Sequence, residues 1–286
     1  MGAGMAGVFA LGGSEVRLAA RTEATLGRAR QRIESLAPEA ADRVMMTTAI
    51  EEALTEADLV VETIAEELDP KQRLLVLAER VAPAAVLTSN TSSLSLAAIA
   101  SALEHPGRFA GLHWFNPPEL VELVEVVATD ATEPDVVDAL AGWMHALEKT
   151  PIVVRRDVPG YIVNRLQYAL LREAFALVEA GICSPADLDV AVTRSLGPRW
   201  AAVGPFATMD FGGLDVFLSV ARNLLPQLSR ATDPPRFLED AIANGELGAK
   251  TGRGLLGDYT PETIQRALAL REQVARSVTS AREELG

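Results

Sequence analysis

A histidine and a glutamate on two apolar segments are the residues of this 286-residue chain best suited to proton transfer. His113 ends the apolar run 109–113, and Glu125 lies in the run 120–127, whose alternation predicts a strand. Two consecutive prolines separate the runs, so we expect the chain to reverse near Pro118. If the two arms return antiparallel, His113 and Glu125 meet. A histidine whose imidazolium is stabilised by a nearby carboxylate can move a proton near neutral pH.

Each residue also has a purely structural interpretation. A histidine at the end of a strand is more often a packed or surface residue than a catalytic one. A glutamate in an apolar strand, such as Glu125, can simply point to water. The pairing across a rigid turn is what favours catalysis for His113 and Glu125.

Composition and charge narrow the class of protein. Hydrophobic residues make up 49% of the chain and charged residues 23%, as in ordinary globular proteins. A formal net charge of -13 disfavours nucleic acid as a partner. No apolar run approaches the roughly 20 residues that span a bilayer, so we expect a cytoplasmic protein with no membrane partner. The single cysteine, Cys183, excludes an internal disulfide, and we expect no metal site.

The spacing of apolar residues predicts two domains. Up to about residue 154, short strands alternate with amphipathic helices, which is typical of a parallel sheet covered on both faces. After that point, helical spacing takes over and we expect no further strand. The change falls at the polar segment 155–160, which ends in Pro-Gly and predicts domains at 1–156 and 157–286. We expect strands at 15–19, 58–62, 85–89 and 109–113, and helices at 22–36, 71–81, 94–103, 162–180, 185–195, 214–228 and 261–284.

The glycines at the start of the chain match G-x-G-x-x-G literally, but in the wrong register. A dinucleotide fingerprint needs a strand before its first glycine, and there is no room for one before Gly2. We therefore interpret Gly2 as the last glycine of the fingerprint and residues 1–11 as the helix that follows it. In that register the central first strand is missing, which leaves two inner sheet edges unpaired. We expect the natural protein to start upstream or the sequence to be incomplete.

Several longer motifs resemble the 3-hydroxyacyl-CoA dehydrogenase family, in the family's order and over nearly the whole chain. The resemblance rests on segments 1–13, 61–71, 89–94, 113–127, 159–165 and 248–254. It implies a Rossmann-type doubly wound parallel sheet followed by an all-α domain that binds substrate and forms a homodimer. It also implies an oxidoreductase that transfers hydride between NAD or NADP and a 3-hydroxyacyl or 3-hydroxy-acid substrate.

The resemblance assigns roles to particular residues. His113 is the general base, with Glu125 as its partner, and Ser92 and Asn164 hydrogen-bond the substrate oxygen. The cofactor site takes in Gly2, Arg21, Glu66, Lys71, Ser92 and Lys250. Structural alternatives remain for several of these residues: Ser92 and Asn164 can cap helices, Glu66 can favour the positive end of the next helix, and Lys250 can be a loop charge.

Two departures from the family pattern bear on cofactor and substrate. The second strand of the fold usually ends in an acidic residue that binds the adenine ribose, whereas this chain has Ala20 and then Arg21. We therefore expect NADP to be accepted and weakly favoured. The stretch between Arg21 and Asp58 is too short for the helical hairpin that holds CoA. One alternative is therefore an activity like that of relatives that act on free sugar acids, carnitine or pyridine carboxylates. Another is a non-catalytic binding or structural role.

Overall fold

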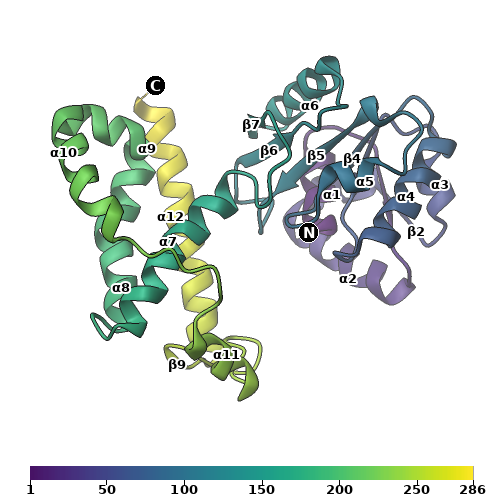
Figure 1. Cartoon of the computed structure of the whole chain (residues 1–286). Helices are drawn as coiled ribbons and strands as arrows, with labels where there is room; N and C mark the ends of the chain where they lie inside the picture. The colour runs from purple at the N-terminus through teal and green to yellow at the C-terminus, as the bar shows by residue number, and fades with distance from the viewer. Residues whose placement is uncertain (286) are drawn as a thin grey trace. The chain divides into compact units, whose positions relative to one another are not determined.

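The computed structural model describes the backbone of residues 1–285 and all their side chains except those of residues 282, 283 and 285. The chain forms two units, residues 1–165 and residues 166–286 (Figure 1). The first unit contains both strands that carry His113 and Glu125, together with the first turn of the helix that begins at Val163.

A five-stranded sheet forms the centre of the first unit. Its order is β3 (Leu59–Glu62), β4 (Val86–Ser89), β5 (Phe109–Trp114), β6 (Leu123–Val127) and β7 (Thr150–Val154). All neighbours in it are parallel except β5 and β6. A separate two-stranded parallel sheet joins β1 (Val16–Ala19) to β2 (Val44–Thr47). Each strand of the first unit is short and apolar, as the alternating sequence pattern predicts.

Helix α1 (Gly2–Leu11) lies between the two sheets. Met5 and Val8 belong to the same apolar cluster as residues of β5 and β6, whereas Ala6 and Ala10 belong to the cluster that contains Val44 of β2. No described ladder pairs β1 with β3, and the two sheets are separate. This agrees with the gap between them that the register of the glycine motif predicts. The predicted fold class, a parallel-dominated sheet followed by helices, is confirmed.

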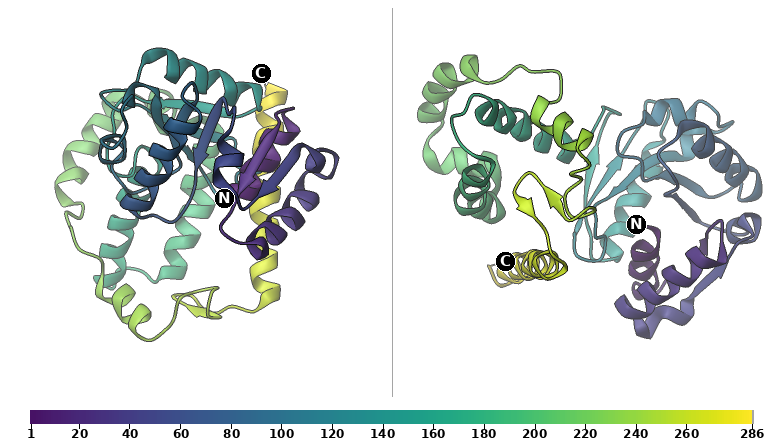
Figure 2. Two further views of the ribbon diagram at one scale, coloured as in Figure 1. Left: turned by 90° about the vertical axis from the view of Figure 1, so that its right-hand side faces the viewer. Right: turned by 90° about the horizontal axis from the view of Figure 1, so that it is seen from below.

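Helices cover both faces of the five-stranded sheet (Figure 2). One apolar cluster joins the sheet to α4 (Leu68–Val81) and α5 (Leu96–Ala100), and another joins it to α1 and α6 (Pro134–Ala146). Helix α5 is shorter than the predicted 94–103 at both ends, and the Ser95 side chain caps its start. The remaining elements of this unit are α2 (Glu23–Leu36), η1 (Pro38–Arg43), α3 (Ile50–Leu54) and η2 (Pro106–Arg108).

The second unit is helical. Its helical elements are α7 (Val163–Glu179), which starts in the first unit, α8 (Pro185–Ala191), η3 (Val192–Leu196), α9 (Gly197–Gly212), α10 (Leu214–Leu224), η4 (Leu225–Gln227), α11 (Arg236–Ala243) and α12 (Pro261–Leu285). The expectation of no strand after residue 154 is wrong, because β8 (Arg253–Gly254) and β9 (Gly257–Asp258) form a minimal antiparallel hairpin. Two residues per strand, rich in glycine, give no alternating pattern to detect. Across the described residues, no helix is long and apolar enough to cross a membrane.

Candidate active site

The predicted meeting of His113 and Glu125 is confirmed by the structure. The two residues face each other directly in the antiparallel ladder between β5 and β6. Opposite residues in such a ladder project from the same face of the sheet, so their side chains meet. His113 Nδ1 lies 2.7 Å from Glu125 Oε2, and both side chains are buried, with 6% and 0% of their surface exposed.

The second carboxylate oxygen of Glu125 binds the start of α7. Glu125 Oε1 accepts hydrogen bonds from the backbone N–H of Ile162 at 2.9 Å and of Val163 at 3.0 Å. Both oxygens of the Glu125 carboxylate therefore act as acceptors, and the Nδ1–H of His113 donates the hydrogen bond to Oε2. This leaves His113 Nε2 as the nitrogen that can exchange a proton with another molecule. These backbone contacts join residues 37 and 38 positions apart, and the sequence pattern gave no signal for them.

The turn between the two strands is held by a buried lysine that the sequence analysis missed. Lys149 Nζ donates to the backbone oxygens of Pro118 at 2.7 Å and Val121 at 3.1 Å, and lies 5.6 Å from the centre of the Trp114 ring. Burial lowers the pKa of Lys149, while the carboxylates of Glu122 and Glu119 act in the opposite direction. The ammonium thus braces the loop that connects His113 to Glu125. In the sequence, the only sign that Lys149 has a structural role was its position just before a strand.

Glu66 organises the loop that follows β4. Its Oε1 accepts hydrogen bonds from the backbone N–H of Ser92 and Ser93, at 3.0 and 3.1 Å, and from the hydroxyls of Thr91 and Ser93. Partial burial acts to raise the pKa of Glu66, but these hydrogen bonds and the charge of Lys71 lower it to about 2. Glu66 is therefore ionised throughout the neutral range. The alternative that Ser92 caps the next helix is wrong, because Ser95 is that cap.

Lys71 lies in a buried ion pair beneath this loop. Its Nζ is 2.7 Å from Glu62 Oε1, 3.3 Å from Glu66 Oε2 and 3.3 Å from the backbone oxygen of Ile64. Glu62 Oε2 in turn accepts the Ser89 hydroxyl at 2.5 Å. The ammonium predicted to line the cofactor site is thus fully occupied by protein groups. Glu62, at the centre of this network, was not singled out from the sequence.

The remaining predicted residues lie apart from the His113–Glu125 pair along the chain. Asn164 is half-buried in the first turn of α7, next to the amides that bind Glu125. Arg21 is exposed just after β1, and Lys250 is exposed in the turn before β8 of the helical unit. Gly2 is the first residue of α1. The structure therefore brings together His113 with Glu125, and Glu66 with Ser92 and Lys71.

The start of α1 fits a dinucleotide phosphate. Its N-terminal N–H groups have no side-chain cap, and its first turn has no acidic residue. A Cβ at Gly2 would lie 3.3 Å from Thr63 Cγ2, beyond the end of β3, so a side chain there would crowd Thr63. Free amides at a helix N-terminus are a ready site for the pyrophosphate of a dinucleotide.

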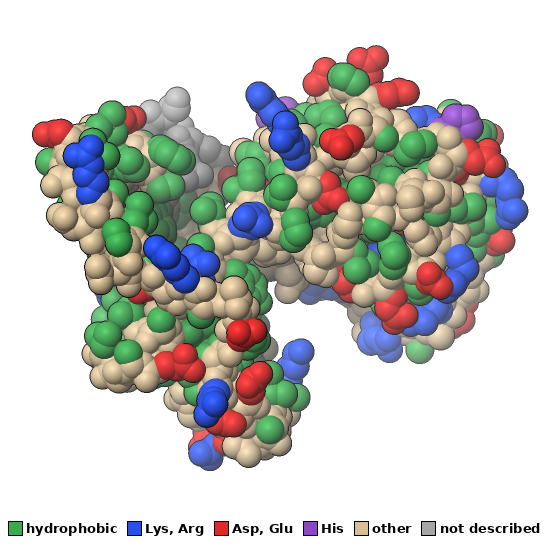
Figure 3. Space-filling model, viewed as in Figure 1, with side chains coloured by type: hydrophobic (Ala, Val, Ile, Leu, Met, Phe, Trp, Pro, Cys, Tyr) green, Lys and Arg blue, Asp and Glu red, His purple; other side chains and the backbone are tan. Residues whose placement is uncertain are grey.

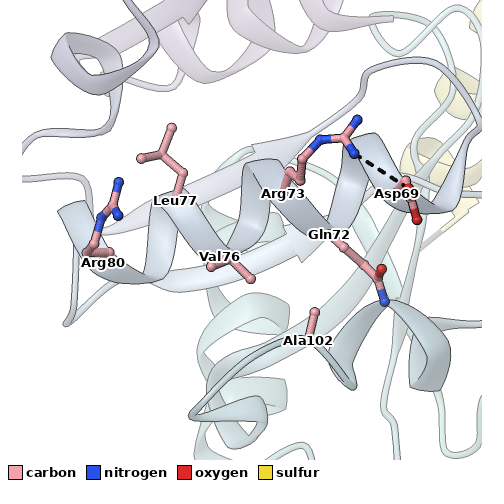
Figure 4. Close-up of a pocket in the computed structure, with 7 residues that line it drawn as sticks. All are labelled: Asp69, Gln72, Arg73, Val76, Leu77, Arg80 and Ala102. Atoms are coloured by element: carbon pink, nitrogen blue, oxygen red, sulfur yellow. Dashed lines mark ion pairs between the residues drawn. The ribbon is translucent and has the colours of Figure 1, made fainter.

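A surface hollow along the outer side of α4 contains none of the predicted site residues (Figure 4). Arg73 points along it toward Asp69, with 3.5 Å between Nη1 and Oδ2, and both side chains are largely exposed. Its lining comprises Asp69, Gln72, Arg73, Val76, Leu77, Arg80 and Ala102. Because this hollow has no buried ionisable pair, we place the candidate active site at the His113–Glu125 pair instead.

A parallel-dominated nucleotide-type domain with a buried histidine–glutamate pair, followed by a helical region, is the architecture of a nicotinamide-dependent dehydrogenase. Residues 1–158 match the model of the 3-hydroxyacyl-CoA dehydrogenase NAD binding domain, and residues 160–258 match that of the C-terminal domain of the same enzymes. The chain belongs to the 3-hydroxyacyl-CoA dehydrogenase family and is an NAD-dependent dehydrogenase that acts on CH–OH groups.

Individual relatives span different substrates. The chain is 32% identical to 5-formyl-3-hydroxy-2-methylpyridine 4-carboxylate 5-dehydrogenase of Mesorhizobium japonicum, over 100% of this chain and 95% of that one. It is 35% identical to L-carnitine dehydrogenase of Streptomyces griseus, over 85% and 74% of the two chains.

Two solved structures that resemble this one also belong to enzymes with different substrates. One is of 5-formyl-3-hydroxy-2-methylpyridine 4-carboxylic acid 5-dehydrogenase, an NAD⁺-dependent dismutase, with a TM-score of 0.90, 33% identity and coverage of 100% of this chain and 95% of that one. The other is (S)-3-hydroxybutyryl-CoA dehydrogenase of Ralstonia eutropha, with a TM-score of 0.73, 28% identity and coverage of 91% and 95%.

Proposed function

We propose that this protein interconverts a secondary alcohol and its ketone on a small 3-hydroxy acid, with His113 as the group that exchanges the proton. The observation that carries the proposal is the buried 2.7 Å contact between His113 Nδ1 and Glu125 Oε2, because it fixes the ring and leaves Nε2 free. A bound nicotinamide supplies the hydride acceptor in the oxidation direction. His113 Nε2 takes the hydroxyl proton, and Glu125 stabilises the imidazolium that forms. In reduction, His113 returns the proton.

Other residues hold the substrate and cofactor in this proposal. The Ser92 hydroxyl, on the loop that Glu66 fixes, and the Asn164 amide, in the first turn of α7, donate to the substrate oxygen. Gly2 and the amides after it receive the pyrophosphate, and Glu66 and Lys71 complete the cofactor site of the first unit. Lys250, in the second unit, is assigned to cofactor binding by its sequence motif alone. Since the Lys71 ammonium is bound to Glu62 and Glu66, it acts by fixing the loop above it.

We propose further that the substrate carries no CoA. Between β1 and β3 the chain forms α2, the short η1, β2 and the five-residue α3, so it has no second long helix to make a hairpin with α2. The likeness to the pyridine-carboxylate enzyme, with a TM-score of 0.90, exceeds the likeness to the CoA-ester enzyme, at 0.73. Both observations support a free acid as substrate.

The purified protein is expected to oxidise free 3-hydroxybutyrate, L-carnitine or both with kcat/KM at least tenfold above that for (S)-3-hydroxybutyryl-CoA. The measurement is the absorbance of the reduced nicotinamide at matched substrate concentrations. A preference for the CoA ester contradicts the free-acid proposal. Failure to bind either nicotinamide cofactor contradicts the enzymatic role and favours a non-catalytic one.

We also propose that NADP serves as cofactor besides NAD. Arg21 is exposed directly beyond β1, where an acidic residue would bind the ribose hydroxyls of NAD. A guanidinium there pairs with a 2'-phosphate. The same assay, run with NAD and NADP in parallel, is expected to give kcat/KM for NADP equal to or above that for NAD. A strong preference for NAD would overturn this assignment.

The helical region from residue 157 onward supports a homodimer. In residues 166–281 the only buried residues are Ala174, Pro235 and Ala241, and apolar side chains lie open over this unit (Figure 3). Phe206 and Phe211 are each 79% exposed. An exposed apolar surface of this extent marks an interface. Light scattering is expected to give the mass of two 30.5 kDa chains, and Phe206→Asp to weaken the dimer. A wild-type protein that stays monomeric at micromolar concentration contradicts the proposal.

A further inference from the structure

Tyr161 occupies an unusual backbone position beside the His113–Glu125 pair. Gly160 has φ 78° and Tyr161 has φ 48°, so two consecutive residues adopt the left-handed conformation that side chains disfavour. The next two residues, Ile162 and Val163, are those whose N–H groups bind Glu125 Oε1. Strain of this kind is concentrated at functional sites.

The ring of Tyr161 packs against the catalytic imidazole. Its centre lies 5.3 Å from that of the His113 ring, with 63° between the planes. Only 2% of the residue is exposed, and it belongs to the apolar cluster that includes Leu87 and Leu96. A phenylalanine would pack in the same way, so packing does not explain why this residue carries a hydroxyl.

The hydroxyl of Tyr161 is buried and has no hydrogen-bond partner. Burying a hydroxyl without a partner lowers stability, so an unpaired one in a native fold calls for an explanation. Burial raises the pKa of this phenol, and the charges of Asp157, Glu66 and Glu125 raise it further. The group therefore stays protonated and is available as a donor.

The carboxylates around Tyr161 are the ones that organise the candidate active site. Glu66 holds the Ser92 loop, Glu125 holds His113, and Asp157 Oδ2 accepts the Ser95 hydroxyl at 3.0 Å. The carboxylate of a substrate would be repelled by these three negative charges, whereas an uncharged oxygen would not. The Tyr161 ring borders the His113 imidazole, with 5.3 Å between ring centres, so a group that reaches His113 lies near this phenol.

We propose that the Tyr161 hydroxyl donates a hydrogen bond to the uncharged oxygen on the reacting carbon of the substrate, the hydroxyl in the alcohol and the carbonyl in the ketone. This inference rests on the proposed function and deepens it. It places the neutral oxygen of a hydroxy acid near His113 and Tyr161. The acid group of the substrate then lies away from the set formed by Glu66, Asp157 and Glu125.

The test compares Tyr161→Phe with Tyr168→Phe, a matched change at a residue that is 65% exposed. The probes are free 3-hydroxybutyrate, L-carnitine and (S)-3-hydroxybutyryl-CoA. Tyr161→Phe is expected to lower kcat/KM about tenfold on each probe that the wild type oxidises. A tenfold change corresponds to about 1.4 kcal/mol. Because the lost hydroxyl has no partner in the protein, Tm is expected to stay at or above the wild-type value, and the Kd for the reduced cofactor to stay at the wild-type value. Tyr168→Phe is expected to change none of these.

Two results overturn the inference. One is an unchanged kcat/KM in Tyr161→Phe. The other is a fall in its Tm of more than about 4 °C, which would assign the hydroxyl to a structural hydrogen bond inside the protein. If the wild-type protein oxidises none of the three probes, the proposed function itself is wrong. This outcome needs no measurement on Tyr161→Phe, so it is distinct from the two results above.

Discussion

A His113→Gln variant is expected to lose about 10²- to 10⁴-fold in kcat, the range that a positioned general acid–base group contributes. Glutamine keeps an amide N–H that can donate to Glu125 Oε2, so the buried carboxylate keeps a partner. It has no group that titrates near neutral pH. The Kd for the reduced cofactor and the Tm are expected to stay close to the wild-type values. Steady-state kinetics, cofactor fluorescence and thermal unfolding measure the three quantities.

The pH dependence of the two reaction directions sharpens this prediction. Oxidation passes a proton to the imidazole and reduction takes one from it, so kcat for oxidation is expected to rise with pH and kcat for reduction to fall. In His113→Gln these opposite trends disappear. His145→Gln, at an exposed position near the end of α6, is the matched control and is expected to behave as wild type. A His113→Gln enzyme that keeps a tenth of its activity would contradict the assigned role.

The features that the sequence predicted well depend on local patterns. Alternation in 120–127, a pair of prolines and the apolar run before His113 were enough to predict antiparallel arms, and the ladder pairs His113 with Glu125 directly. The register of the glycine motif likewise predicted α1 and the absence of a strand between β1 and β3. Each of these inferences used neighbouring residues whose spacing dictates backbone geometry.

The features that sequence reasoning missed depend on contacts between distant residues. The hydrogen bonds of Glu66 to the amides of Ser92 and Ser93, more than 25 residues away, left no signal in the sequence. The unpaired hydroxyl of Tyr161 is visible only once the packing around it is known. Ser95, and not Ser92, caps α5, because the cap depends on where the chain leaves its extended conformation. Nothing in residue type or spacing decides such cases.

A Lys71→Met variant is expected to lower the free energy of unfolding by about 3–5 kcal/mol, the cost of removing one partner from a buried ion pair. Lys71 and Glu62 have 1% and 0% of their side chains exposed, so loss of the ammonium leaves the Glu62 carboxyl group buried without its cationic partner. Methionine keeps most of the apolar volume of the lysine chain, which limits the effect to charge and hydrogen bonding. Urea denaturation followed by circular dichroism measures the change.

Arg73→Met is the matched control, because it breaks another pair on the same helix. Arg73 and Asp69 are 3.5 Å apart with 71% and 81% of their side chains exposed, so water already screens them and the expected cost is below about 1 kcal/mol. If the buried charge is the cause, Glu62→Gln added to Lys71→Met restores more than about 1 kcal/mol, since the double variant buries no unpaired ion. Equal losses in Lys71→Met and Arg73→Met would show that the pair beneath the Glu66 loop contributes no more than a surface contact.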